Sequence, residues 1–302
     1  FVHVLDHPAV AHVHDGGISE EGQPFLVLEL LENARPMDVW ADEERADLRE
    51  KVELIAMAAR GVEHAHGRGV IHRDLKPSNL LVRVDAATGK AQVKIIDFGI
   101  ARATEQILTD TTLVTVMGEV LGTPDYLSPE QAQSGGREVD VRTDVYALGA
   151  ILYQLVSGRP PHDLAARGLS LAEALDVIRH EQATRLEGDR DLALIVAKAM
   201  AKDREQRYAG AGALAEDVER WLRGEPVLAR APSFTYLAGK WVRRHKVAAA
   251  ALALAVMALA GGTVVSSVLA LRAGKAQHDA VVANAQSDFQ RAADLHADGG
   301  VE

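Results

Sequence analysis

Short apolar runs and one long helical pattern occupy the first hundred residues. Residues 9–14 and 24–31 are apolar runs separated by Asp-Gly-Gly at 15–17, which predicts two short strands joined by a turn. Over about 47–67 the apolar side chains recur at helical spacing, which predicts an amphipathic helix. The run Val-Lys-Ile-Ile at 93–96 predicts a further strand. The N-terminal part of the chain therefore mixes strands and helices.

A longer apolar run lies near the C-terminus. Residues 247–271 are 25 positions without a charged or strongly polar side chain. A helix of that length spans roughly 37 Å, enough to cross a hydrocarbon core of ~30 Å with some tilt. Tyr236 and Trp241 precede it, where aromatic residues of a membrane interface would lie. Basic residues are denser before the run than after it: Arg243, Arg244 and Lys246 against Arg272 and Lys275. We therefore predict a single-pass transmembrane helix with the N-terminal part in the cytoplasm, the alternative being a buried helix of a soluble protein.

The charge balance divides the chain into two parts. The formal net charge is −10, but residues 1–222 hold 24 basic and 37 acidic side chains, whereas residues 223–302 hold 9 and 6. An acidic domain is a poor candidate for nucleic-acid binding, which requires basic patches that displace counterions. The chain has no cysteine, which excludes disulfides, thiolate metal sites and cysteine nucleophiles. With 48% apolar and 25% charged residues, a mainly disordered chain is also excluded.

Four polar residues near two predicted loops have the side chains that phosphoryl transfer requires. In this reaction the protein mainly positions phosphates, metal ions and the acceptor hydroxyl. The Asp74 carboxylate can receive or orient the hydroxyl proton, and Lys76 can reach the transferred phosphate. Asn79 and Asp97 offer the oxygen ligands that Mg²⁺ prefers.

Five motifs, in order, resemble those of eukaryotic-type protein kinases. His72-Arg73-Asp74 with Asn79 resembles the catalytic loop, and Asp97-Phe98-Gly99 resembles the magnesium loop. Residues 122–130 resemble the end of the activation segment, with Ser128 where alanine is usual. Residues 140–149 resemble the buried helix of the large lobe, and residues 202–208 resemble the late arginine motif. The resemblance implies an α+β protein-kinase-like fold, with a mainly helical C-terminal lobe and an incomplete β-rich N-terminal lobe, followed by the single transmembrane helix.

The resemblance implies a catalytic role for each matching position. Asp74 would be the catalytic base, and Lys76 would contact the γ-phosphate of ATP. Thr123 would form a hydrogen bond near both of them, where the acceptor residue lies. Asn79 and Asp97 would be the Mg²⁺ ligands.

Nucleotide contacts are implied for the segment that resembles the kinase hinge. The backbone of Glu29 and Leu31 would form hydrogen bonds with adenine, and Leu81 would pack under the base. For Leu81, a place in the apolar core is the alternative. The order Asp-Leu-Lys-Pro-Ser-Asn at 74–79 resembles serine/threonine kinases rather than tyrosine kinases.

Further positions would have structural or regulatory roles. Glu130 and Arg207 would form a buried ion pair, and Asp144 would orient the backbone of the His72-Arg73 turn. Arg73 beside the catalytic base suggests regulation by phosphorylation of the activation segment. The candidate acceptors are Thr104, Thr109, Thr111, Thr112 and Thr115, with a weak preference for the last three. The histidines 64, 66 and 72 are expected to be structural rather than metal ligands.

We expect the small lobe to be incomplete in these residues. A glycine-rich loop, a strand lysine and its partner helix glutamate are missing before His72, so we expect a kinase fragment that lacks the start of its N-terminal lobe and does not turn over as it stands. The expected order is a kinase domain, a linker with a basic juxtamembrane segment, a transmembrane helix and an extracytoplasmic helical stub: residues 1–222 (1–31 from the small lobe and hinge, 32–222 from the large lobe), 223–246, 247–271 and 272–302.

The function expected from these features is that of a membrane-anchored serine/threonine protein kinase in signalling. Its cofactors would be ATP and Mg²⁺, and its partners a Ser/Thr-containing protein substrate and the lipid bilayer, but not nucleic acid. The sequence leaves a homodimer through the membrane region open. A pseudokinase scaffold and a small-molecule phosphotransferase are the competing functions. Intact Asp74, Lys76, Asn79 and Asp97 argue against the first, and Thr123 with residues 128–130 argues against the second.

Overall fold

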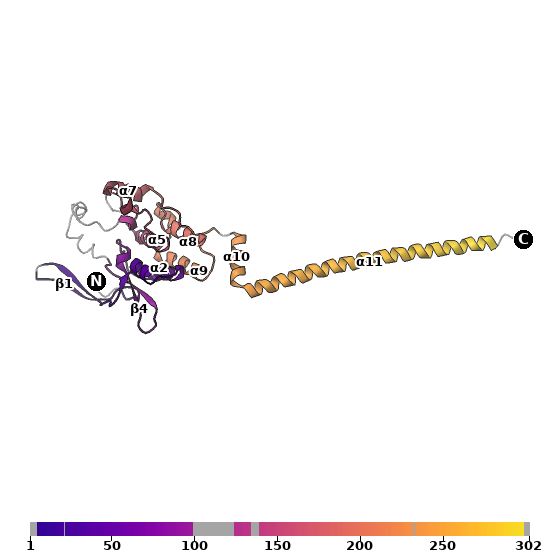
Figure 1. The fold of residues 1–302 in the computed structure, drawn as a ribbon, viewed down its shortest axis with the longest axis horizontal. Helices are drawn as coiled ribbons and strands as arrows, with labels where there is room; N and C mark the ends of the chain where they lie inside the picture. The colour runs from indigo at the N-terminus through magenta and orange to yellow at the C-terminus, as the bar shows by residue number, and fades with distance from the viewer. Residues whose placement is uncertain (1–4, 21, 99–123, 134–138, 232, 299–302) are drawn as a thin grey trace. The chain divides into compact units, whose positions relative to one another are not determined.

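The computed structural model describes residues 5–20, 22–98, 124–133, 139–231 and 233–298 (Figure 1). The chain divides into two compact units, Phe1–Leu237 and Ala238–Glu302, each of which is described by itself. The helices of the first unit include α1 (Met37–Glu43), α2 (Leu48–His66), α5 (Val141–Ser157), α6 (Leu164–Arg167), α7 (Leu171–His180), α8 (Arg190–Ala199) and α9 (Ala211–Leu222). Its strands include β1 (Val13–Ile18), β2 (Pro24–Leu28), β3 (Arg35–Pro36), β4 (Leu80–Val84) and β5 (Ala91–Ile95).

The buried helix α5 lies at the centre of the first unit. The Asp140 carboxylate accepts a hydrogen bond from the Arg142 backbone N–H (2.7 Å) and so caps the helix N-terminus. Helices α2, α8 and α9 pack against α5. Gly149 permits the close approach of α8, because a Cβ at this position would lie 2.7 Å from the Cβ of Ala199. The structure thus confirms the buried helix expected around 140–149.

Helix α2 confirms the amphipathic helix predicted over 47–67. It begins with a capping box, in which the Asp47 side chain accepts from the Glu50 N–H (2.8 Å) and the Glu50 carboxylate accepts from the Asp47 N–H (2.7 Å). Its apolar face is fully buried at Val52, Ile55 and Val62, and the helix packs against α5, α9 and β5. The catalytic loop follows directly after its C-terminus.

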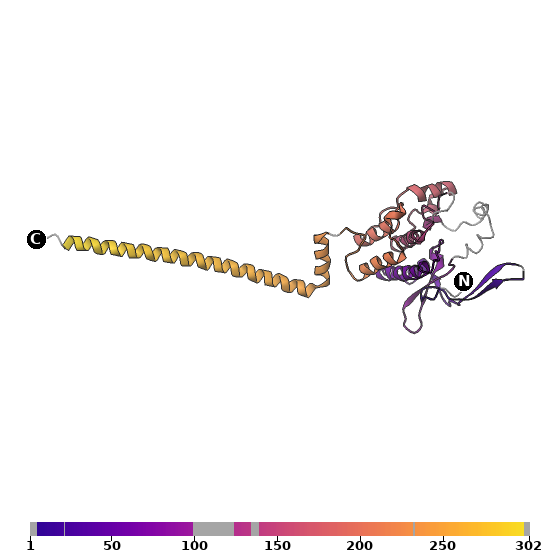
Figure 2. The same cartoon turned by 180° about the vertical axis from the view of Figure 1, so that it is seen from behind.

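The β1–β2 hairpin forms, but its turn is not where the sequence predicted it. Residues 15–17 lie inside β1 and pair with β2, and the chain reverses around Ser19–Gly22 instead. Glycine suits position 17 of the strand because the Phe25 ring crosses over it and leaves little room for a side chain. A Cβ there would lie 2.9 Å from the Cζ atom of Phe25. In both ribbon views the hairpin projects from the body of the unit, and Ile18 is 73% exposed (Figures 1 and 2).

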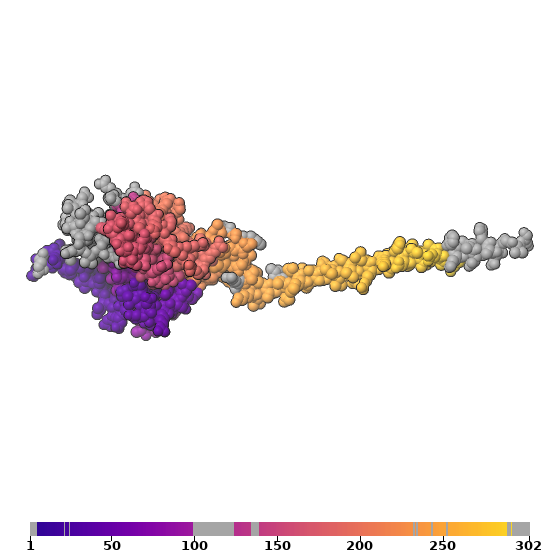
Figure 3. Space-filling view, turned by 45° about the horizontal axis from the view of Figure 1, so that its top comes forward, coloured from indigo at the N-terminus to yellow at the C-terminus, as the bar shows by residue number. Residues whose placement is uncertain are grey.

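The apolar run at residues 9–14 was predicted to form a strand of its own, but its first residues pair with β5 instead. The Ala11 N–H donates to the Ile95 carbonyl (2.9 Å), and the Ile95 N–H donates to the Ala9 carbonyl (2.8 Å), so residues 9–11 run beside β5. β5 itself confirms the strand predicted around 93–96. It continues the antiparallel sheet β3–β4–β5. In the space-filling view the indigo N-terminal residues and helices α5 to α9 of the first unit form one continuous body (Figure 3).

Residues 225–231, which follow α9, are held against the large lobe by two buried carboxylates. The Asp217 carboxylate accepts hydrogen bonds from the backbone N–H groups of Leu228 and Ala229 and from the Tyr208 hydroxyl. Asp191 accepts from the Arg230 guanidinium (3.0 Å) and the Tyr236 hydroxyl (3.1 Å). The segment is therefore part of the packed lobe at these positions.

Tyr236 does not lie where the sequence suggested. It was expected beside a membrane interface, but its side chain is buried in the first unit, with 8% of the residue exposed. Its hydroxyl also accepts the Val227 backbone N–H (2.9 Å), and the Arg230 guanidinium stacks 4.0 Å from its ring centroid. The pairing of this hydroxyl with the buried Asp191 carboxylate explains the difference, because a buried carboxylate needs donors.

We expect Asp217→Ala to destabilise the first unit by at least about 2 kcal/mol, because it leaves buried N–H and O–H donors without an acceptor. Urea unfolding monitored by tryptophan fluorescence measures the change. Asp176→Ala is the control, because the ion pairs of Asp176 with Arg179 and His180 on α7 are exposed. Equal unfolding midpoints for the two variants would contradict the expectation.

The second unit consists mainly of one long helix. Helix α10 (Phe234–Arg244) begins in the first unit, and α11 (Lys246–Asp298) follows after His245 (Figure 1). By length and composition, residues Lys246–Asp288 could cross a membrane, and their most apolar window is not buried. The helix continues beyond the apolar run as far as Asp298.

Candidate active site

The loop between α2 and β4 is organised by one buried carboxylate. Asp144, on α5, accepts hydrogen bonds from the backbone N–H groups of His72 and Arg73, each at 2.8 Å. Its Oδ2 atom also lies 2.7 Å from the Nε2 atom of His66, at the end of α2. This confirms that Asp144 orients the turn. The contact between Asp144 and His66 was not predicted, although His66 was expected near the end of the helix over 47–67.

The loop is strained where it enters the candidate catalytic residues. Arg73 has a φ of 69°, a left-handed conformation that costs a residue with a Cβ roughly 1–2 kcal/mol. Hydrogen bonds from the surrounding structure hold it there, and the next residue is Asp74. Backbone strain of this kind is common at functional sites, where the fold determines one geometry.

Three of the predicted catalytic side chains meet in this loop. The Lys76 ammonium donates to the Asp74 carboxylate (2.8 Å). The Asn79 amide donates to the Asp74 carbonyl (2.8 Å) and is 3.3 Å from its Oδ2 atom. Asp74 is well exposed, with 64% of its side chain accessible, whereas Asn79 is 5% exposed. The carboxylate is thus available to a substrate and has a cation beside it.

Asp97 lies next to this cluster through the backbone. The Ile96 N–H donates to the Asn79 carbonyl (3.0 Å), and the Ile96 carbonyl lies 2.9 Å from the Nε2 atom of His72. The His72 and Phe98 rings pack with their centroids 4.8 Å apart. These contacts bring the end of β5 against the catalytic loop. Asp97 follows with a φ of 62° and an exposed side chain.

The oxygen donors present here suit magnesium. The Asn79 amide nitrogen donates to the Asp74 carbonyl, so Oδ1 is the amide atom that can accept a hydrogen bond or bind a cation. Asn79 Oδ1 and the Asp97 carboxylate would be the oxygen ligands, since Mg²⁺ commonly takes one or two such ligands together with waters and substrate phosphates. Among the described residues, no group of three or more His, Asp or Glu side chains forms a dedicated metal cage.

The predicted hinge contains an ion pair that the sequence did not reveal. The Glu29 carboxylate accepts from the Lys94 ammonium of β5 and from the His12 N–H (3.0 Å). Burial alone would raise the pKa of Glu29, but the Lys94 hydrogen bond and charge outweigh it and lower that pKa. The Glu29 N–H donates to the His12 carbonyl (2.9 Å), and no described residue donates a hydrogen bond to the Glu29 carbonyl.

The other two predicted nucleotide-binding residues lie near this pair. Leu31 is half-buried, and its carbonyl accepts from the Ala34 N–H (3.3 Å). Leu81 is also half-buried on β4, where it pairs with Lys94 of β5. An apolar side chain at the sheet beside the hinge could support a base. Lys94 stands within an apolar run, and a lysine inside a predicted buried strand was the available signal for its ion pair.

The ion pair predicted between the activation segment and the large lobe is present. The Arg207 guanidinium donates to both oxygens of Glu130, at 2.7 and 2.8 Å. Thr143 donates to the same carboxylate (2.8 Å). Burial alone would raise the pKa of Glu130, but the bonds to Arg207 outweigh it and the pKa lies below its usual value. The pair is therefore charged at neutral pH.

Thr123 lies outside the described residues, and so do Gly99 and the threonines named as phosphorylation candidates. Their expected roles stay predictions. The described part of the segment resumes at Pro124.

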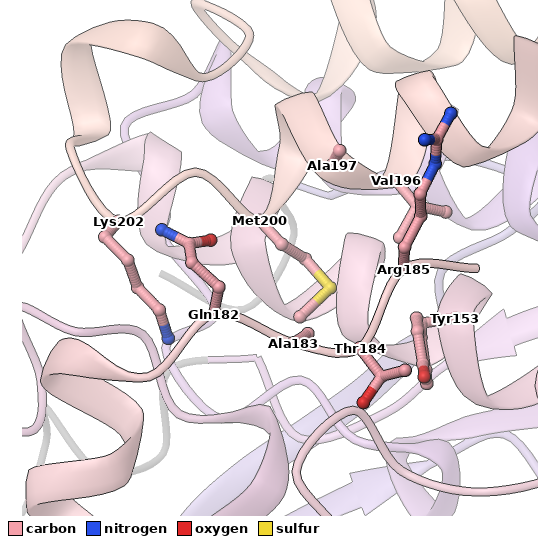
Figure 4. A pocket seen from close by; sticks show the side chains of 9 residues that line it. All are labelled: Tyr153, Gln182, Ala183, Thr184, Arg185, Val196, Ala197, Met200 and Lys202. Carbon is pink, nitrogen blue, oxygen red and sulfur yellow. The ribbon is translucent and has the colours of Figure 1, made fainter.

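A small hollow lies elsewhere in the large lobe (Figure 4). Its volume is about 70 Å³, and its walls come from α5, α8 and residues 182–185. Lys202 at its edge donates to the Ile178 carbonyl (2.7 Å). Burial, assisted by the charge of Arg207, lowers the pKa of Lys202 to about 8. All nine residues around the hollow lie outside the catalytic loop, so the hollow is separate from the candidate site.

Comparison with known proteins adds to this geometry. The protein kinase domain family matches residues 1–218. The serine/threonine-protein kinase PknB of Mycobacterium leprae is 36% identical over 229 residues, which cover 74% of this chain and 35% of the relative. PknB of Mycobacterium tuberculosis (strain H37Rv) is 37% identical over 229 residues, 74% of this chain and 34% of the relative.

A more distant relative agrees with these two. The probable serine/threonine-protein kinase PknB of Bifidobacterium longum is 31% identical over 251 residues, 80% of this chain and 35% of the relative. The chain thus spans about one third of the length of these relatives. With the ordered motifs, the buried Asp144 beneath the catalytic loop and the match over 1–218, the chain belongs to the protein kinase family and is similar to its bacterial serine/threonine kinases.

Proposed function

We propose that the full-length protein transfers the γ-phosphate of ATP to serine and threonine hydroxyls of protein substrates, and that it does so while anchored in a membrane. The observation that carries the proposal is the cluster of Asp74, Lys76 and Asn79 within hydrogen-bonding distance, beside the strand end that bears Asp97. A scaffold without catalysis has no requirement for this combination of base, cation and metal ligands.

Each side chain has a defined task in this reaction. The exposed Asp74 carboxylate receives or orients the proton of the attacking hydroxyl. The Lys76 ammonium, 2.8 Å from Asp74, supplies positive charge for the transferred phosphate. Asn79 Oδ1 and the Asp97 carboxylate hold Mg²⁺, which neutralises charge on the phosphates when it is bound. Thr123, which lies outside the described residues, is assigned a hydrogen bond near Asp74 and Lys76, where the acceptor residue lies.

The nucleotide base lies against the hinge in this proposal. The Glu29 carbonyl and the Leu31 backbone form its hydrogen bonds, and Leu81 packs beneath the ring. The Lys94–Glu29 ion pair supports the hinge backbone from the side of β5. The residues between Asp74 and Asn79, together with relatives named as serine/threonine kinases, support hydroxyl acceptors on serine and threonine.

The membrane part rests on α11. Its apolar residues 247–271 cross the bilayer as a single pass, the kinase domain lies in the cytoplasm and residues 272–302 lie on the other side. Trp241, 46% exposed near the end of α10, and the basic residues around it are suited to the lipid headgroups. Two copies could associate through this membrane region.

The transfer is tested with the full-length protein, labelled ATP, Mg²⁺ and a Ser/Thr-rich protein such as myelin basic protein. We expect label on phosphoserine and phosphothreonine, and loss of transfer on addition of EDTA or in the Asp97→Asn variant. Binding of ATP without transfer would favour the scaffold. Label on small-molecule alcohols alone would favour the phosphotransferase.

The anchor is tested separately. After expression in a bacterial host, we expect the protein to remain in the membrane fraction after a carbonate wash. A reporter active only in the periplasm should be active when fused after residue 298 and inactive when fused after residue 230. Release into the soluble fraction would remove the anchor and leave the kinase proposal in place.

A further inference from the structure

Gln131, next to the ion-paired Glu130, contacts the catalytic loop directly. Its side-chain Nε2 atom donates to the backbone carbonyl of Arg73 at 2.6 Å. The two residues are 58 positions apart in the sequence, so only the fold brings them together. No role was predicted for Gln131 from the sequence.

The orientation of the Gln131 amide follows from its partners. The Arg73 carbonyl can only accept, so the group facing it must be the NH₂ group. On the other side, the Gln131 Oε1 atom lies 3.1 Å from both the backbone nitrogen and the hydroxyl of Ser128, which donate to it. Ser128 is fully buried and stands where the kinase family usually has alanine, so its hydroxyl adds a donor that holds the amide in place.

The peptide that Gln131 contacts is the one that leads into Asp74. Arg73 is held in the left-handed conformation, with its N–H bound to Asp144 at 2.8 Å. Its carbonyl belongs to the peptide plane shared with the Asp74 nitrogen, which among the described residues contacts His72 Nδ1 at 3.3 Å. The 2.6 Å bond from Gln131 is the shorter of these two contacts with the plane and restrains its rotation.

We propose that Gln131 is a positioning residue for the catalytic carboxylate: it ties the end of the activation segment to the strained Arg73–Asp74 peptide and so sets the direction of the Asp74 side chain. Glu130 is bound to Arg207 in the lobe, so the neighbouring Gln131 has a fixed base from which to act. The kinetic consequences of this inference rest on the proposed kinase function, whereas its structural consequence does not.

The Gln131→Glu variant gives a readout that a general loss of stability would not produce. An ionised glutamate has no donor and places negative charge against the Arg73 carbonyl. A protonated glutamate is nearly isosteric with glutamine and can donate again. We expect kcat of the full-length variant to fall by roughly 10- to 100-fold at pH 8, with KM for ATP within about twofold of the wild type. The ratio of variant to wild-type kcat should rise as the pH is lowered toward 5.5.

Gln133→Glu is the matched control. Gln133 is exposed two residues further along, and the substitution makes the same charge change without touching the catalytic loop. Its kcat should match the wild type at every pH. A Gln131→Glu variant with wild-type kcat at pH 8, or with a ratio that does not change with pH, would overturn the proposal.

Hydrogen–deuterium exchange tests the structural part without any activity. In Gln131→Ala we expect faster exchange in peptides covering residues 72–76 than in the wild type, with unchanged exchange in peptides of α5. Faster exchange in both places would indicate general unfolding and would contradict a specific tie, as would unchanged exchange in both. If the wild-type protein transfers no phosphate, the proposed function fails, and the exchange result still decides whether Gln131 holds the loop.

Discussion

Asp74→Asn in the full-length protein is expected to lower kcat for phosphoryl transfer by roughly 10²- to 10⁴-fold, the range typical for loss of a general base. Asparagine keeps the size of the side chain but cannot accept the hydroxyl proton, and it also removes the charge that pairs with Lys76 at 2.8 Å. Because Asp74 is exposed, the substitution should leave the fold intact. Steady-state kinetics with saturating ATP measure the change.

Asp85→Asn is the control for this loss of charge. Asp85 is a half-buried carboxylate in the turn between β4 and β5, where it accepts from the N–H groups of Ala87 and Thr88. We expect wild-type kcat for this variant and similar unfolding temperatures for both. An Asp74→Asn variant with near wild-type kcat would show that the carboxylate has no part in the chemistry.

Arg207→Ala is expected to reduce the free energy of unfolding by about 3–5 kcal/mol, because it leaves a carboxylate buried without its cation. The Arg207 side chain is fully buried, and besides Glu130 it donates to the backbone carbonyls of Ala201, Arg142 and Lys202. Those acceptors lose their donors in the variant as well. Urea unfolding of the wild type and the variant, followed by circular dichroism, gives the difference.

The pKa of Glu130 determines how this difference in the free energy of unfolding depends on pH. The pKa of Glu130 is lowered in the folded state, so its contribution to stability is complete above the ordinary value of 4.5 and is lost as the pH falls through the lower folded value. The gap between wild type and Arg207→Ala should therefore narrow below about pH 4.5. Arg167→Ala, which breaks an exposed pair with Glu181, serves as control and should leave the unfolding midpoint almost unchanged. A similar effect of both variants would contradict the prediction.

Much of the large lobe was predictable because its signals are local. The helix predicted over 47–67 carries its own capping box at Asp47 and Glu50, and its apolar spacing marks the buried face. The Asp144 contact and the Glu130–Arg207 pair were predictable through resemblance, because each residue belongs to a motif whose partner motif is also present. The catalytic roles of Asp74, Lys76, Asn79 and Asp97 stay predictions, although the fold brings the first three together.

The wrong predictions share a cause: in each, a contact with a residue outside the local motif overrode the local signal. Glycines near residue 16 suggest a turn, but Gly17 instead makes room for the Phe25 ring across the hairpin. Tyr236 precedes a basic, apolar stretch, as an interfacial residue would, but the buried Asp191 binds its hydroxyl. Neither Phe25 nor Asp191 can be recognised as the partner from the residues around the glycines or the tyrosine.

By itself, the order of residues determined the family, the large helices and the four polar groups suited to phosphate chemistry, since periodicity, capping and motif spacing are properties of short stretches. Only the tertiary structure decided the further contacts around those groups: His66 against Asp144, Lys94 against the hinge and Gln131 on the Arg73 carbonyl. Such hydrogen bonds join residues tens of positions apart, and a side-chain amide or carboxylate meets its partner only after the intervening chain has packed.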